Sequence, residues 1–165
     1  MTKTNLGLYV RNFTFGVEDS LVSTVGLLSG VAVAGLSEKD IFTTGVILIF
    51  VEALSMGSGS FLSEHATEEI EEKRKSSLTK PITGAIIMFF SYIIAGLIPL
   101  LPYILFETNK AVIYSIVASL IGLIVLGVIN AQTVKKGILR HALEMVFIGG
   151  TSILVGIIVG KFLGR

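Results

Sequence analysis

Cysteine and tryptophan are both absent from this 165-residue chain, and only 15% of its residues are charged. Without cysteine the chain has neither a disulfide framework nor a thiolate metal site. The formal net charge of +1 is too small to indicate nucleic-acid binding, so no nucleic acid is expected as a partner. The chain also lacks a His-Glu-x-x-His motif, a Gly-x-Ser-x-Gly motif on a strand-to-helix turn and a cysteine nucleophile, so we predict that it is not an enzyme.

Hydrophobic residues, by contrast, make up 52% of the chain, and the mean hydropathy is +0.84. This balance is typical of an integral membrane protein surrounded by lipid. The apolar runs predict an all-α, polytopic fold with one transmembrane domain and five transmembrane helices. We place these spans at about 13–36, 41–62, 81–105, 111–134 and 139–163, with a polar cytoplasmic connector at 63–80.

The distribution of basic residues predicts the orientation of these spans. With the N-terminus in the cytoplasm, nine of the 13 Lys and Arg residues fall in segments or helix ends on the inner side. The positive-inside rule therefore favours a cytoplasmic N-terminus. Since no organelle-targeting signal is evident, we expect a prokaryotic plasma membrane.

A short turn, Ser37-Glu38-Lys39-Asp40, joins the first two predicted spans. Ser37 and Asp40 resemble an N-cap residue and its partner three positions later, which indicates that a helix begins here. A turn this short makes the two helices antiparallel neighbours.

Three carboxylates lie inside the first two apolar runs: Glu18, Asp19 and Glu52. A charge deep in a bilayer costs about 3 kcal/mol on insertion scales, so such residues are rare and indicate a functional site. The alternative is a structural role in which Asp19 and Glu52 form hydrogen bonds between helices. Glu18 lies about 100° around the helix from Asp19, so it either pairs with a basic group or faces an aqueous inlet.

Helix geometry places a thioether near these carboxylates. At about 1.5 Å per residue, Asp19 and Met56 both lie roughly 9 Å from the cytoplasmic side, and Glu52 lies roughly 15 Å deep. Carboxylate oxygen with thioether sulfur suits Fe²⁺ or Mn²⁺ better than Ca²⁺ or Mg²⁺. We therefore expect a path for a transition-metal cation in which protons compete for the same carboxylates. A methionine on an apolar helix is, however, more often packing filler than a ligand.

Two rows of small or polar residues predict close helix contacts, either within the chain or in a homodimer. The rows are Asp19, Ser23, Gly26 and Gly30 on the first span, and Ser152, Gly156 and Gly160 on the fifth.

Further polar residues carry weaker signals. The connector is compatible with a continuation of the second helix, and its acidic residues Glu68, Glu69, Glu71 and Glu72, with His65, either gather cations or form a solvated face. His141 and Glu144 are three residues apart, a spacing that places two ligands on one helical face. An ordinary helix end explains these two and Asn130 equally well.

Two segments, FGVEDSLVSTVGLLSGVAVAG at 15–35 and VEALSMGSGSFLSE at 51–64, resemble the vacuolar iron transporter family. Members carry an Asp-Gly-Leu-Val-Ser-like motif in the first span and an Ala-Leu-Ser-Met-like motif in the second. The resemblance implies a homodimer of five-helix subunits with a cation path at the interface, and proton-coupled removal of Fe²⁺ or Mn²⁺ from the cytoplasm. Asp19 and Met56 match the family's metal-path residues, and no resident cofactor is expected.

The chain departs from the family pattern in two places. Gly59-Ser60-Phe61 stands where relatives often read Gly-Glu-Tyr, and only 63–80 replaces a longer glutamate-rich cytoplasmic domain. The sequence thus resembles a short member that lacks most of the cytoplasmic metal-binding domain. The alternative function is a membrane scaffold or partner-binding protein whose buried carboxylates are structural.

Overall fold

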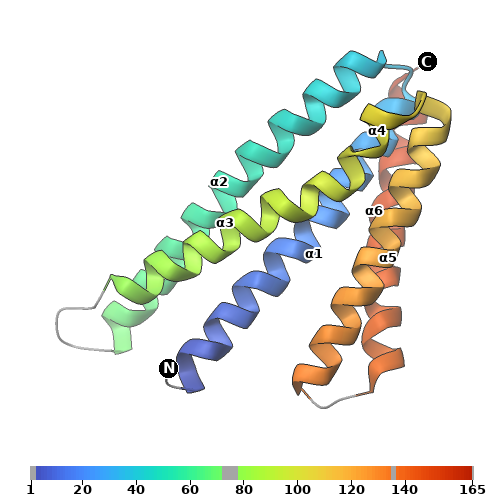
Figure 1. Cartoon of the computed structure of the whole chain (residues 1–165). Coiled ribbons are helices and arrows are strands. Elements are labelled where there is room, and N and C mark those ends of the chain that lie inside the picture. The colour runs from blue at the N-terminus through green and yellow to red at the C-terminus, as the bar shows by residue number, and fades with distance from the viewer. Residues whose placement is uncertain (1–2, 72–77, 135–136, 165) are drawn as a thin grey trace.

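The fold consists entirely of helices in the part of the chain that the computed structural model describes, residues 3–71, 78–134 and 137–164. The helices are α1 (Lys3–Val33), α2 (Glu38–Glu71), α3 (Thr79–Leu100), α4 (Pro102–Leu105), α5 (Thr108–Val134) and α6 (Ile138–Leu163). Five helical segments are long and apolar enough to cross a membrane, with the short α4 continuing the span of α3 (Figure 1). The predicted all-α, five-span membrane fold is confirmed.

Two helices extend beyond the apolar runs that predicted them. α1 begins at Lys3, within the polar N-terminal segment, and α2 continues to Glu71, within the polar connector. Hydropathy marks where a helix is apolar, whereas a helix continues wherever its backbone hydrogen bonds and side-chain propensities permit. Residues 72–77 of the connector lie outside the described part of the chain.

The turn between α1 and α2 uses a C-terminal and an N-terminal capping motif in succession. Gly35 has a positive φ of 89°, and the N–H of Leu36 donates to the carbonyl oxygen of Val31 at 3.2 Å, as in a Schellman motif. The Ser37 hydroxyl then accepts a hydrogen bond from the Asp40 N–H at 3.3 Å and donates one to the Asp40 carboxylate at 2.6 Å. The helix start predicted at this turn is confirmed.

α1 is the central helix and packs against each of the other four long helices (Figure 1). Its most extensive contacts are with α3 and α6. α2 packs mainly against α3, and α1 and α2 diverge with distance from their shared turn (Figure 1). The two helices of the hairpin are therefore antiparallel, but α3 supplies most of the contact between α2 and the rest of the protein.

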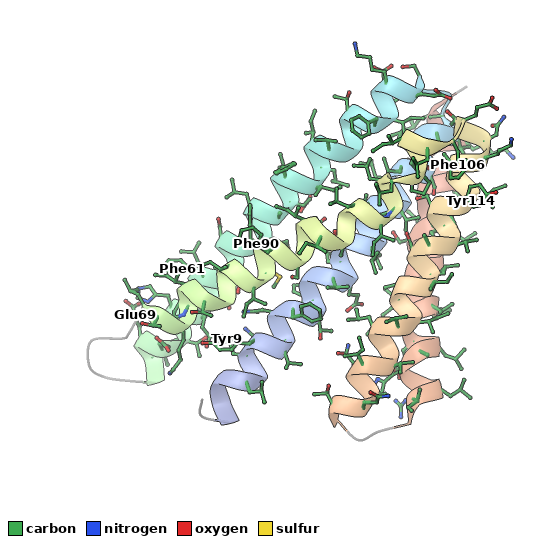
Figure 2. All side chains as sticks on the ribbon, viewed as in Figure 1. Tyr9, Phe61, Glu69, Phe90, Phe106 and Tyr114 are labelled. Atoms are coloured by element: carbon green, nitrogen blue, oxygen red, sulfur yellow. The ribbon has the colours of Figure 1, made fainter. Side chains whose placement is uncertain are left out.

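Apolar side chains divide between a small core and a large outer surface. One buried cluster gathers Leu28, Ile49 and Leu100, from α1, α2 and α3. The outer faces of the helices are also apolar, as Phe90 on α3 illustrates with 54% of its surface exposed (Figure 2). An apolar exterior of this extent is stable only in contact with lipid or another apolar surface.

The small residues of α1 and α6 form the closest helix contact. A Cβ atom on Gly30 would lie 2.7 Å from the carbonyl oxygen of Gly156, and one on Gly156 would overlap the backbone of Gly26. Ser152 donates a hydrogen bond to the carbonyl oxygen of Val22 at 3.0 Å. The two predicted ridges therefore pack against each other within one chain.

This contact predicts the effect of adding one methyl group to either of two glycines on α6. Gly156→Ala should lower the free energy of unfolding by about 1–3 kcal/mol, because the methyl group has no room against Gly26. Gly150→Ala is the matched control, since a Cβ atom there meets nothing within 4 Å. Thermal unfolding in detergent micelles measures both variants, and equal midpoints for the two would contradict the packing described.

Candidate functional site

The structure brings together two of the three carboxylates that lie in the apolar helices. Asp19 of α1 and Glu52 of α2 are close enough for their charges to repel each other, and both act on the side chain of Tyr92 from α3. The Tyr92 and Ser23 hydroxyl groups are hydrogen-bonded at 2.7 Å. Three helices therefore contribute polar groups to one region of the helical domain.

Tyr92 is held at this point by the packing of α3 against α1. Its side chain is fully buried, and its carbonyl oxygen accepts a hydrogen bond from the Ser20 hydroxyl at 2.6 Å. One turn earlier, Gly16 allows close contact, since a Cβ atom there would lie 3.0 Å from the carbonyl oxygen of Met88. Gly16 and Ser20, four residues apart on α1, thus fix the position of Tyr92 along the helix axis of α1, near the carboxylates.

Neither Asp19 nor Glu52 forms an ion pair with a basic side chain of residues 6–70, 78–133 or 137–164, the side chains that the structure describes. Two carboxylates in an apolar setting with no positive partner repel each other and lose hydration. A bound cation or proton removes that penalty.

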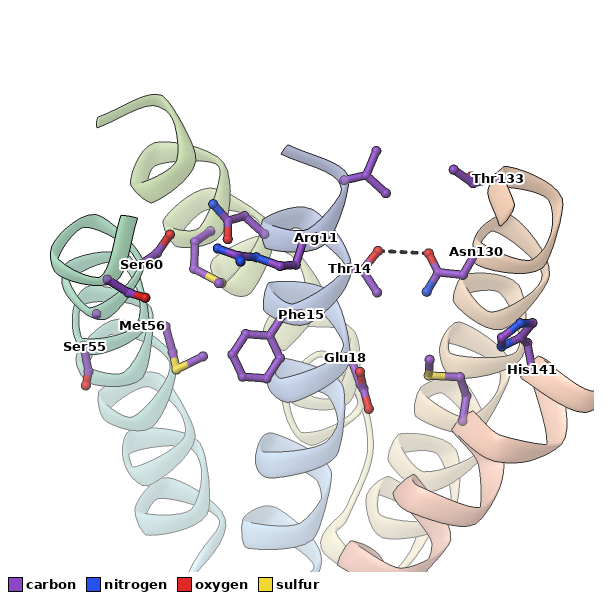
Figure 3. Close-up of a pocket in the computed structure, with 16 residues that line it drawn as sticks. Arg11, Thr14, Phe15, Glu18, Ser55, Met56, Ser60, Asn130, Thr133 and His141 are labelled. Carbon is purple, nitrogen blue, oxygen red and sulfur yellow. Dashed lines mark hydrogen bonds between the residues drawn. The ribbon is translucent and has the colours of Figure 1, made fainter. Parts of the chain in front are cut away.

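A cavity of about 850 Å³ opens along α1 and is lined by residues of α1, α2, α3, α5 and α6 (Figure 3). On the α2 side it contains Met56, Gly59 and Ser63, which share one face of α2 with Glu52. Met56 lies beside Phe15 in this region (Figure 3). The thioether therefore faces an open cavity one helical turn from Glu52.

Glu18 lines the same cavity but points to the other side of α1. It faces the gap between α1 and the helices α5 and α6, where Asn130 and His141 also lie (Figure 3). Near it, the Thr14 hydroxyl donates a hydrogen bond to the Asn130 side-chain oxygen at 2.9 Å. Of the two sequence alternatives for Glu18, the position in a cavity agrees with the structure, and no basic residue of the described part pairs with it.

The stripe predicted on α1 is divided between two neighbouring helices. Ser23 contacts Tyr92 of α3, whereas Gly26 and Gly30 contact α6. Because neighbouring helices cross α1 at an angle, one row of residues does not stay against one partner over several turns. The expectation that this row makes helix contacts is confirmed, and the contacts are with two different helices.

The acidic residues of the connector occupy a different region. Glu68 is buried and forms an ion pair with Lys80 at 3.0 Å, and Glu69 pairs with His65 at 3.4 Å. The side chain of Glu71 and all of Glu72 lie outside the described part of the chain. Within that part, no three His, Asp or Glu side chains gather as a metal-binding group.

Sequence reasoning did not identify Tyr92, the third member of the carboxylate site. The only local signal was a tyrosine in the middle of an apolar run, and buried tyrosines usually seek a hydrogen-bond partner. Which partner it finds depends on how α3 packs against α1, which periodicity alone does not specify.

The fold and the site define a polytopic α-helical membrane protein whose helical domain contains carboxylates with no basic partner among the described side chains. The model of the VIT family matches residues 10–78 and 64–161, which together span most of the chain. The chain belongs to the VIT family.

The chain is also similar to curated proteins from a plant. Vacuolar iron transporter homolog 4 of Arabidopsis thaliana is 28% identical over 153 residues, covering 86% of this chain and 77% of the relative. Vacuolar iron transporter homolog 2.1 of the same plant is 26% identical over 180 residues, covering 94% and 82%. These relatives are named as transporter homologs, in agreement with the prediction that the chain is not an enzyme.

Proposed function

We propose that the protein transports divalent transition-metal cations, Fe²⁺ or Mn²⁺, out of the cytoplasm in exchange for protons. The observation that carries this proposal is the pair formed by Asp19 and Glu52, whose charges interact without a basic partner among the described residues. Two such carboxylates provide hard oxygen ligands and the charge to attract a cation from water. The names of the plant relatives support iron as the cargo.

Met56 extends the proposed path toward the cavity. Its sulfur lies on the same face of α2 as Glu52, so an ion that enters through the cavity meets a thioether before it reaches the carboxylate pair. A soft sulfur ligand favours transition metals over Ca²⁺ and Mg²⁺. Proton exchange follows from the same groups, because a carboxylate that binds a proton no longer attracts the metal.

Direction and location follow from the predicted orientation. With the N-terminus in the cytoplasm, the cavity opens on the cytoplasmic side, since its lining residues Arg11 and Thr14 lie near the start of α1. The ion then passes toward the α1–α2 turn on the opposite side. A prokaryotic plasma membrane remains the predicted location, whereas the relatives carry the vacuole in their names.

The connector residues have a secondary role in this proposal. Glu68 and Glu69 already hold basic partners, so they act at most on ions that approach the cavity. Full collection of metal by the connector would need Glu71 and Glu72 in addition. The transport proposal does not depend on these four residues.

A homodimer completes the path in our proposal. One subunit supplies two carboxylates and a thioether, fewer ligands than the four to six that these ions usually take. α1 also exposes Arg11, Phe15 and part of Glu18 toward the open cavity. A second subunit across that face would supply the missing ligands and cover the apolar surface.

The competing function is a scaffold in which the carboxylates only join helices. It fits the packing of α1 but does not explain why two partly buried carboxylates lie near each other with no basic partner in the described part of the chain. Under this alternative, Asp19→Asn and Glu52→Gln would change stability and leave metal uptake unaltered.

The transport proposal predicts the behaviour of Asp19→Asn in sealed proteoliposomes. Purified wild type should carry Fe²⁺ or Mn²⁺ across the bilayer with opposing proton movement, and Asp19→Asn should lose both because a neutral amide neither attracts the cation nor exchanges a proton. Metal-sensitive and pH-sensitive dyes report the two fluxes. Glu107→Gln, which neutralises an exposed carboxylate outside the spans, is the control and should retain flux. Normal flux in Asp19→Asn would overturn the proposal.

The homodimer predicts a cross-linking pattern that the cysteine-free chain makes easy to read. Phe15→Cys, on the open face of α1, should form a covalent dimer when membranes are oxidised, because α1 would meet its copy near the symmetry axis. Phe90→Cys has similar exposure but lies on the outer face of α3, and it should stay monomeric. Equal cross-linking of the two variants, or none at Phe15→Cys, would contradict this interface.

A further inference from the structure

The first turn of α6 contains a histidine that is oriented by a carboxylate. Nδ1 of His141 lies 3.2 Å from Oε2 of Glu144, and Oε1 of Glu144 accepts a hydrogen bond from Nε of Arg140 at 2.8 Å. The glutamate is therefore held by two neighbours on its own helix. Because Nδ1 faces a carboxylate, it carries the proton, and the lone pair of the neutral imidazole is on Nε2.

Backbone packing fixes this histidine in place. Gly127 of α5 allows α6 to approach so closely that a Cβ atom on Gly127 would lie 2.9 Å from Cα of Ala142 and 3.0 Å from the carbonyl oxygen of His141. The backbone that carries the imidazole is thus in direct contact with α5. The contact with α5 fixes the backbone position of His141, and the Glu144 carboxylate orients its ring.

Nε2 of His141 is buried and has no hydrogen-bond partner among the described residues. A buried polar atom without a partner is unusual in a folded protein and requires an explanation. Glu144 provides a hydrogen-bond partner for Nδ1 of His141, but neither Glu144 nor Arg140 provides one for Nε2. Nε2 is therefore the ring atom of His141 that is available to a metal ion or a hydrogen-bond donor.

His141 lines a cavity that also contains other donor atoms. Glu18 of α1 and Met145 of α6 line it together with His141, and Glu18 points into the gap between α1 and α6 (Figure 3). Imidazole nitrogen, carboxylate oxygen and thioether sulfur together suit Fe²⁺, Mn²⁺ or a similar transition metal. The side-chain oxygen of Asn130 accepts a hydrogen bond from Thr14, and the proposed site does not include it as a ligand.

We propose a second cation site on the α6 side of α1, in which His141 Nε2 is the main protein ligand, Glu18 and Met145 face the ion, and Glu144 is a positioning residue. The arrangement of a carboxylate behind a metal-binding histidine is a common way to fix the tautomer and strengthen the ligand. Three acidic or histidine side chains do not gather at one point in the described part of the chain. Water therefore completes the coordination shell, and the site holds a partly hydrated ion that can leave again.

This site is centred on α6, whereas the pair of Asp19 and Glu52 lies between α1 and α2. Glu18 connects the two, because its charge interacts with that of its sequence neighbour Asp19. Asp19 and Glu52 interact with each other and with Tyr92 of α3, whereas His141 and Met145 belong to α6 and face Glu18. The site deepens the proposed transport function and rests on it, because it adds a loading position at the mouth of the same cavity.

The chain contains only two histidines, His65 and His141, so a nitrogen ligand is readily assigned. The full-length protein, without a polyhistidine tag, is purified in detergent and given Mn²⁺, and pulsed electron paramagnetic resonance measures ¹⁴N coupling to the bound ion. We expect imidazole coupling in the wild type and in the control His65→Gln, and its loss in His141→Gln. Glu144→Gln retains the ligand but loses its orientation, so the nitrogen-coupled Mn²⁺ should bind about 10- to 100-fold more weakly.

The opposite results overturn the site. These are bound Mn²⁺ without nitrogen coupling in the wild type, coupling that persists in His141→Gln, or Glu144→Gln with unchanged affinity. If His141→Gln fails to fold, Glu144→Gln decides the question. Metal flux without nitrogen coupling would remove this site and leave the transport proposal intact, whereas coupling without flux would remove the transport proposal and retain a metal-binding site.

Discussion

The backbone contact between α1 and α6 is the constraint on which the rest of the structure depends. Gly26 and Gly30 meet Gly156 and Gly160 with no space for a side chain, so α6 is held directly against the central helix. In lipid, where apolar side chains gain little from leaving the solvent, such close packing is a main source of helix association. The α1–α6 contact leaves α2 free to diverge from α1 on the other side.

This divergence creates the cavity in which the polar groups lie. α3 fills the space between α1 and α2 near the carboxylate pair, and Tyr92 enters there with its hydroxyl on Ser23. Toward the N-terminal end of α1 the helices separate further, and Arg11 reaches Glu64 of α2 at 3.3 Å. The cavity on this side is lined by Glu18 and Met56, which are the immediate neighbour of Asp19 in sequence and the residue one turn from Glu52.

Hydropathy and spacing predicted the five spans and the Ser37–Asp40 helix start. Hydropathy and residue spacing do not predict the distances between helices. Depth estimates along each helix axis gave no separation between α1 and α2, so they did not show that Asp19 and Glu52 interact. Tyr92 and the orientation of Glu18 likewise depend on which helices surround α1, and a single sequence reports only which faces are polar.

The central claim is that Asp19 and Glu52 together bind a divalent cation, and metal-dependent thermal stability tests it most directly. At about 100 times its Kd, Mn²⁺ should stabilise the wild type by about 2.7 kcal/mol. The double variant Asp19→Asn/Glu52→Gln should unfold at the same temperature with and without Mn²⁺, and without metal it should be at least as stable as the wild type because the repulsion is gone. Equal stabilisation of both proteins by Mn²⁺, or a double variant that is less stable without metal, would contradict the account.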